Sequence, residues 1–122
     1  CYYASSVLEK QKGLMLVSSG IEFKNYETAK NEILAQLEDV KAGKIGDDEL
    51  EGARSILINS HLSMEDDQGR LEEFWLGQAV AGTERTPKEL AARLETVTRE
   101  QVAAAARRLE LDTVYFLKGK EQ

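Results

Sequence analysis

The sequence predicts an α+β fold, a two-layer sandwich in which helices cover one face of an antiparallel sheet. Three observations lead to this class. Two apolar runs joined by a charged turn begin the sequence, apolar residues then recur every three or four positions, and a further apolar run lies near the end. Alternating runs indicate strands and the longer period indicates helices, so the predicted order is β-β-α-α-α-α-β.

The first two runs predict a β-hairpin. CYYASSV (1–7) and GLMLVSSGI (13–21) are rich in aliphatic, aromatic and hydroxyl side chains, and the charged residues EKQK with Gly13 lie between them as a turn. Both faces of the second run are apolar near its centre. This pattern is typical of a strand inside a sheet, with a neighbour on each side.

The middle of the sequence predicts two long helices. Asn25 is a plausible N-cap for the first, and Gly43 stands where a helix stops. Asp47 and Asp48 open the second, which we expect to break near EDDQG (65–69) because Asp and Gly disfavour helix interiors. The side chains expected to face the core on the first helix are those of Tyr26, Ala29, Ile33, Leu37 and Val40. On the second helix they are those of Leu50, Ala53, Leu57, His61 and Met64, and beyond the break the pattern resumes at Leu71, Trp75 and Ala79.

Two further helix starts are marked by capping boxes. Thr86 precedes Pro87 and stands three residues before Glu89, which is the strongest start signal in the sequence. Thr98 and Gln101 repeat the pattern and open an alanine-rich helix. Both segments are therefore predicted to be helical.

The run DTVYFLKG (112–119) predicts a closing strand. Three strands against this many helices would leave long apolar sheet edges, which proteins normally cover. We therefore expect residues 1–122 to form a single partial domain. Its other strands would come from the rest of a longer parent protein or from another copy.

Charge and composition exclude several classes of protein. The net charge of −6 and the mixing of basic with acidic residues argue against nucleic-acid binding, which needs clustered Lys and Arg. No apolar run approaches the roughly 18 residues of a membrane span, so we expect no membrane partner. The single Cys excludes an internal disulfide framework and favours a cytoplasmic location.

Residues suited to chemistry are sparse. The one His, His61, has no His or Cys four residues away, so we expect it to pack in a core or an interface and not to bind a metal. Glu65, Asp66 and Asp67 match no calcium loop and predict a solvated break. No GxSxG, glycine-rich phosphate loop or CxxC is present. We expect no metal site and no cofactor in this chain.

Cys1 supports an alternative function. Enzymes with an N-terminal Cys nucleophile use the free α-amino group, with a pKa of about 8, as the general base. An N-terminal-nucleophile amidohydrolase using Cys1 is therefore the second hypothesis. Such enzymes generally need two stacked sheets, and the three strands predicted here are too few to build them. We therefore interpret Cys1 as a truncation point.

Taken together, these segments resemble the insulinase-like, pitrilysin-type zinc metallopeptidase family. CYYASS, GLMLVSSGIEF, the helix–turn–helix NYETAKNEILAQLEDVKAGKIGDDELEGAR and the closing TPKELAARLETVTREQVAAAARRL and DTVYFL resemble the C-terminal part of a C-terminal homologous domain. Within SMEDDQGRLEEFWLGQAVAG, the family-like positions are Ser63, Glu65, Arg70 and Gly77. The resemblance covers nearly the whole chain, and it is closest to bacterial members that act as noncatalytic partners.

The resemblance implies a noncatalytic role. Active members hold zinc through an HxxEH helix and a distant Glu in the N-terminal homologous domain, and this chain has no HxxEH. Any zinc would therefore belong to the parent protein or a partner subunit. Tyr2 matches the Tyr of an Arg–Tyr pair that holds substrate, but the matching Arg would lie before Cys1. We expect no catalytic residue here.

The same resemblance implies several partners. The chain would contribute chamber wall, contacts with a peptide or polypeptide substrate, and a subunit interface. The missing N-terminal portion or a homologous subunit would complete the domain. Because of its uncovered sheet edges, the isolated chain is expected to self-associate.

Overall fold

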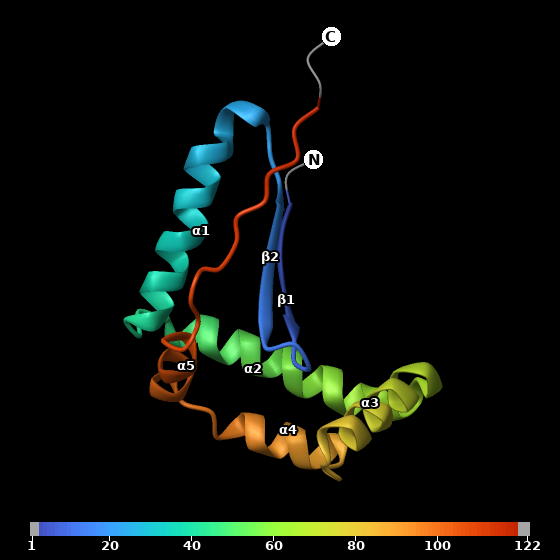
Figure 1. Ribbon diagram of the computed structural model, residues 1–122. Helices are drawn as coiled ribbons and strands as arrows, with labels where there is room; N and C mark the ends of the chain where they lie inside the picture. The colour runs from blue at the N-terminus through green and yellow to red at the C-terminus, as the bar shows by residue number, and fades with distance from the viewer. Residues whose placement is uncertain (1–2, 120–122) are drawn as a thin grey trace. The chain divides into compact units, whose positions relative to one another are not determined.

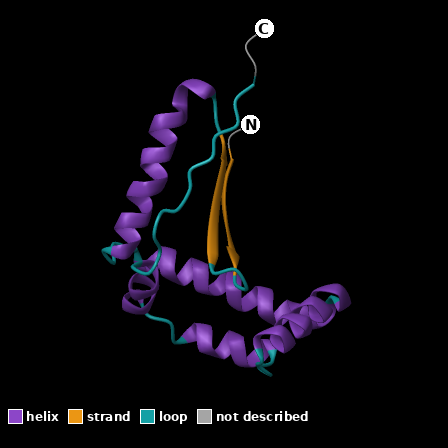
Figure 2. Cartoon of the chain, viewed as in Figure 1, coloured by secondary structure: helices purple, strands orange, loops and turns teal. Residues whose placement is uncertain are grey.

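The computed structural model describes residues 3–119 and has the predicted α+β class (Figures 1 and 2). Within that range, two antiparallel strands precede five α-helices, an arrangement consistent with two layers. The elements are β1 (Tyr3–Glu9), β2 (Leu14–Gly20), α1 (Tyr26–Lys41), α2 (Asp47–Leu62), α3 (Gln68–Ala81), α4 (Pro87–Glu95) and α5 (Arg99–Ala106). No helix in this range is long and apolar enough to cross a membrane.

The chain divides into two compact units. The first, called here the hairpin unit, comprises the described parts of Cys1–Gly43 and Ala103–Gln122. The second, called the helical unit, is Lys44–Val102 and holds α2, α3 and α4. The boundaries fall after Gly43 and within α5.

The hairpin forms where the sequence predicts it. β1 and β2 pair antiparallel from Tyr3 opposite Gly20 to Glu9 opposite Leu14. Gly13 adopts a φ of 65°, a left-handed conformation that costs glycine little, and the Lys12 amide donates to the Glu9 carbonyl at 3.1 Å. The local turn chemistry therefore fixes the register.

α1 also follows its prediction. Asn25 occupies the N-cap position, although its side chain makes no capping hydrogen bond, and Gly43 follows the helix with a φ of 77°. The Arg107 Nε donates to the Lys41 carbonyl at 2.9 Å, which ties the end of α1 to the residues after α5. The expected inner face is half-buried at all five positions.

The predicted closing strand is wrong for the described chain, because residues 109–119 form neither strand nor helix. A strand needs the backbone of a neighbour, and in the described range β1 and β2 pair only with each other. The segment is held by side chains instead. Phe116 stacks on Tyr26 and Phe23 with ring centroids 4.2 and 5.8 Å apart, and the Lys118 ammonium lies 4.2 Å from the Phe23 ring.

The start of α4 confirms the predicted capping box. The Glu89 amide donates to the Thr86 hydroxyl at 3.2 Å, and the Thr86 amide donates to the Glu89 carboxylate at 2.7 Å. The backbone and then the hydroxyl of Thr86 hold the pKa of Glu89 below its ordinary value. Thr98 and Gln101 make the same reciprocal pair at the start of α5.

The inner face of α2 agrees with the prediction at its two ends, where Leu50, His61 and Met64 are half-buried, and is shifted by one position between them. Ala53 and Leu57 are exposed, whereas Arg54 and Ile58 are half-buried. Arg54 turns inward because the Val97 carbonyl, between α4 and α5, accepts hydrogen bonds from its Nε at 3.1 Å and from its terminal guanidinium nitrogen. The aliphatic part of the Arg54 side chain is therefore half-buried, while its guanidinium group has hydrogen-bond partners.

The break after α2 is confirmed. A short 3₁₀ turn covers Ser63–Asp66, and the Asp67 carboxylate caps α3 by accepting from the Arg70 amide at 3.1 Å. Leu71 is half-buried as expected. Trp75 and Ala79 are exposed instead of buried, because α3 turns Phe74 inward.

Candidate functional site

The β1–β2 hairpin presents apolar side chains on both of its faces. Successive strand residues point to opposite faces, so the register assigns each side chain to one of them. One face holds Tyr3, Val7, Leu14 and Leu16, and the other holds Ala4, Leu8, Met15 and Val17. The sheet therefore has no polar face that is adapted to water.

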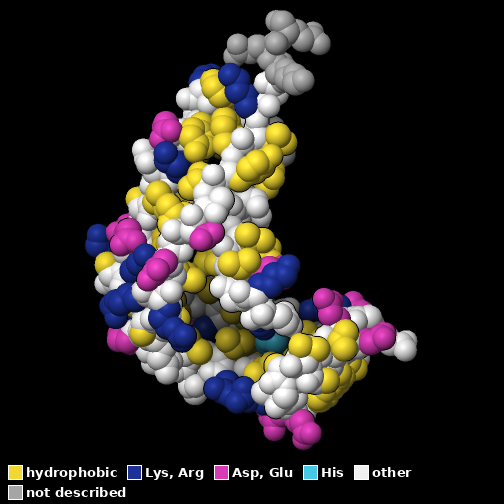
Figure 3. All heavy atoms as spheres, viewed as in Figure 1, with side chains coloured by type: hydrophobic (Ala, Val, Ile, Leu, Met, Phe, Trp, Pro, Cys, Tyr) yellow, Lys and Arg dark blue, Asp and Glu magenta, His cyan; other side chains and the backbone are white. Residues whose placement is uncertain are grey.

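These side chains are exposed. Their exposed fractions run from 38% at Met15 to 64% at Leu8, and Figure 3 shows hydrophobic side chains over the hairpin on the face drawn. In the described part of the hairpin unit, the only buried apolar residues are Ala103 and Ala106 of α5. Such a continuous exposed apolar surface usually marks an interaction site.

Both strand edges are also open. Within residues 3–119 the sheet contains only β1 and β2, so neither has a second neighbour. The strand expected to flank β2 is not supplied by the described residues. An open edge presents backbone N–H and C=O groups that can pair with an added strand.

A shallow hollow adjoins the turn end of this surface. Its volume is about 290 Å³, and it lies between the hairpin and the residues that close α5. Its lining residues are Leu8, Glu9, Lys10, Gly13, Leu14, Ala105, Arg108 and Leu109. Apolar strand ends and an Arg side chain therefore meet at one rim of the hairpin.

Cys1 and Tyr2 lie outside the described residues, so the structure tests neither the nucleophile hypothesis nor the substrate contact predicted for Tyr2. The strand serines are described. Ser5 stands opposite Ser18 in the register, and Ser6 opposite Val17.

His61 is half-buried in the helical unit. Its ring meets the Phe74 ring edge-on, with centroids 6.3 Å apart and an interplanar angle of 74°. This contact agrees with the predicted packing role. Among the described residues, no group of three His, Cys, Asp or Glu side chains could hold a metal ion.

Three of the four family-like positions near the break between α2 and α3, namely Ser63, Glu65 and Arg70, make contacts within the helical unit. The Arg70 guanidinium donates to the carbonyl and the hydroxyl of Ser60, each at 2.9 Å. Glu65 forms an ion pair with Lys88 at 3.2 Å. A Cβ at Gly77 would meet no atom within 4 Å. Arg70 thus joins the two helices across the break.

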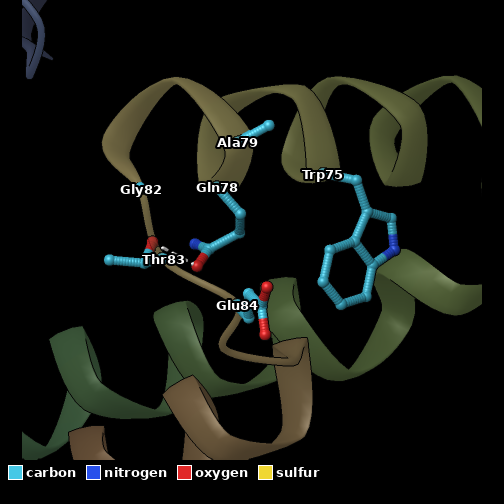
Figure 4. Close-up of a pocket in the computed structure, with 6 residues that line it drawn as sticks. All are labelled: Trp75, Gln78, Ala79, Gly82, Thr83 and Glu84. Atoms are coloured by element: carbon cyan, nitrogen blue, oxygen red, sulfur yellow. Dashed lines mark hydrogen bonds between the residues drawn. The ribbon is translucent and has the colours of Figure 1, made fainter.

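A second hollow, of about 590 Å³, lies at the end of α3 in the helical unit (Figure 4). It is lined by Trp75, Gln78, Ala79, Gly82, Thr83 and Glu84. Sequence reasoning missed it because Trp75 fits the helical spacing of a core position. The signal for it in the sequence is Gly82, a residue that favours a helix end. It follows Trp75 by only seven positions and so places Trp75 near the end of α3.

Comparison with known proteins identifies a related class of protein. No protein-family model matches the chain. The chain is similar, however, to a metalloprotease homologue. That relative is "Probable inactive metalloprotease YmfF" from Bacillus subtilis (strain 168), 38% identical over 120 residues, which are 98% of this chain and 28% of that protein.

A solved structure supports the same fold. "Crystal structure of a conserved protein from Enterococcus faecalis V583" matches with a TM-score of 0.79 and 34% identity, over 88% of this chain and 26% of that chain. The chain thus spans about a quarter of the length of each relative. The similarity to the Bacillus subtilis protein supports the predicted relationship to metallopeptidase homologues.

Proposed function

We propose that this chain is a noncatalytic segment of an insulinase-like, pitrilysin-type metallopeptidase homologue, and that its hairpin holds extended polypeptide. The observation that carries this proposal is the 38% identity, over nearly the whole chain, to a protein named an inactive metalloprotease. The segment would form part of a chamber wall and of a subunit interface.

The described residues, 3–119, do not fit a zinc centre. The sequence contains no HxxEH, and its single His packs against Phe74. Among residues 3–119, no three potential ligands converge. No metal-dependent step therefore follows from these residues, and zinc would be held by the parent protein or a partner subunit.

The hairpin suits an extended polypeptide for two reasons. Its open edges can add a strand through backbone hydrogen bonds, which are independent of the added sequence. Its apolar faces offer contacts for alternate side chains of that strand. Backbone pairing would supply affinity, and the apolar contacts would supply preference for apolar sequences.

Peptide binding tests this role. A fluorescein-labelled octapeptide of alternating Val and Thr is expected to bind saturably, as measured by fluorescence anisotropy. Leu16→Asp places a charge on the hairpin face and is expected to weaken binding about tenfold, which corresponds to about 1.4 kcal/mol. Leu16 is already 52% exposed, so the variant should keep the helical circular dichroism of the parent.

Leu111→Asp is the matched control. It makes the same chemical change at a leucine that is 60% exposed and lies outside the hairpin. Its affinity should stay within twofold of the unaltered chain. Equal weakening by both variants, or binding unaffected by either, would contradict a role for the hairpin.

Self-association is a second expected property. The open edges and apolar faces of β1 and β2 should pair between copies of the isolated chain. Static light scattering is expected to give a mass that rises with concentration above the 13.6 kDa of one chain. Val17→Lys, which charges β2, should lower this mass. A monodisperse monomer at micromolar concentration would refute the expectation.

A further inference from the structure

The hollow at the end of α3 combines three features that favour a cation. Its residues come from the last turns of α3 and from the turn that follows; the side chains of Trp75 and Glu84 lie on the same side of α3, and the Gln78 amide turns toward Thr83 (Figure 4). The indole offers an aromatic face and Glu84 a carboxylate. The C-terminal end of a helix adds a partial negative charge.

The turn after α3 brings Glu84 back toward the helix. Gly82 takes a φ of 65°, and the Thr83 amide donates to the Gln78 carbonyl at 2.9 Å, which closes the helix in a Schellman-type turn. The Gln78 side-chain oxygen accepts from the Thr83 hydroxyl at 2.6 Å and from the Arg85 amide at 3.1 Å. These bonds hold the backbone on either side of Glu84.

The local charges leave this carboxylate available. Among the described residues, Glu84 has no hydrogen bond or ion pair. Lys88 pairs with Glu65, and Arg85 lies close enough to Glu89 to lower the pKa of that carboxyl, after the larger effect of Thr86. Trp75 remains 42% exposed, with its edge contact to Phe74.

From this arrangement we infer that the hollow binds the guanidinium group of an arginine side chain on a polypeptide. A guanidinium can stack on the Trp75 ring while it donates two parallel hydrogen bonds to the Glu84 carboxylate. Ala79 and the edge of the Trp75 ring, which line the hollow, provide apolar contacts for residues that flank the arginine. This inference is independent of the hairpin and of the proposed function.

The single tryptophan makes the site directly observable. Because Trp75 is the only Trp in the sequence, tryptophan emission reports on this hollow alone. The peptide acetyl-Ala-Arg-Ala-amide is expected to change that emission saturably. The matched peptide with citrulline, which is neutral and nearly the same shape, should bind at least fivefold more weakly.

A variant pair tests the carboxylate. Glu84→Gln lies on an exposed turn and should weaken binding of the arginine peptide about fivefold. Glu72→Gln changes the chain's charge equally from an exposed position of α3 outside the hollow and should have no effect. Methylguanidinium, a free cation with the same charge, should bind more weakly than the peptide because it lacks the flanking groups.

Three results would overturn the inference. Equal binding of the citrulline peptide would exclude charge recognition, and equal behaviour of Glu84→Gln and Glu72→Gln would exclude the carboxylate. Methylguanidinium binding as tightly as the peptide would make a free cation the ligand. The hairpin variant Leu16→Asp should leave the tryptophan signal unchanged, so failure here is distinguishable from failure of the hairpin proposal.

Discussion

Ala91→Asp is expected to destabilise the chain by at least about 3 kcal/mol, the largest effect of a single substitution that we predict. Ala91 is 3% exposed on α4, which packs against α2. Pro87, one turn earlier, is buried on the same face. A carboxylate at this position would lose its water, and the larger side chain would also separate the helices.

Urea denaturation followed by circular dichroism measures this effect, and Ala92→Asp is its control. Ala92 is the next residue of α4 and is exposed, so the same change there should cost less than about 1 kcal/mol, most of it the lower helix propensity of Asp. Similar free energies of unfolding for the two variants would contradict the observed orientation of α4. A separation of at least about 2 kcal/mol would support it.

Arg54→Met is expected to destabilise the chain by about 2 kcal/mol. Methionine keeps much of the aliphatic stem but removes both hydrogen bonds to the Val97 carbonyl, one of them at 3.1 Å. Hydrogen bonds from charged groups contribute roughly 1.5–3 kcal/mol, and a half-buried carbonyl left without a donor adds to the loss. The midpoint of thermal unfolding should fall by roughly 8 °C.

Glu51→Gln separates this contribution from the neighbouring ion pair. Glu51 pairs with Arg54 at 2.9 Å, but its side chain is 69% exposed, and surface pairs contribute little. The variant should therefore change the free energy of unfolding by less than about 0.5 kcal/mol. If Glu51→Gln cost as much as Arg54→Met, the ion pair and not the Val97 carbonyl would hold Arg54.

Local signals explain why much of the fold could be predicted from the sequence. The capping box at Thr86 and Glu89 and the left-handed Gly13 and Gly43 depend on residues within a few positions of one another. Their geometry is therefore encoded nearby. The hairpin also depends on a short turn between two alternating runs.

The errors arise where distant residues decide the structure. Helical spacing allows two adjacent faces of α2, and the Val97 carbonyl, 43 residues away, selects the one that includes Arg54. The segment 112–119 has a strand-like composition, but a strand also needs a neighbour. Trp75 has the spacing of a core residue, yet α3 leaves it partly exposed beside Glu84.

The candidate sites could also be predicted only where they depend on residues close in sequence. The apolar character of both hairpin faces was visible in the sequence, and the register confirms which residues share each face. The hollow beside Trp75 was not predicted, because it depends on the turn at Gly82 that brings Glu84 back toward α3. The prediction for Tyr2 remains untested, since that residue lies outside the described range.

The fate of a bound peptide tests the central claim most directly. The chain, its Cys1→Ser variant and a protein-free blank would each be incubated with the Val–Thr octapeptide and zinc, and the peptide analysed by mass spectrometry. A noncatalytic segment predicts that the octapeptide is recovered intact from all three samples, while fluorescence anisotropy shows that the chain binds it saturably. Cleavage of the octapeptide by the unaltered chain would contradict the account. If the Cys1→Ser variant then failed to cleave the peptide, the nucleophile hypothesis would be favoured instead.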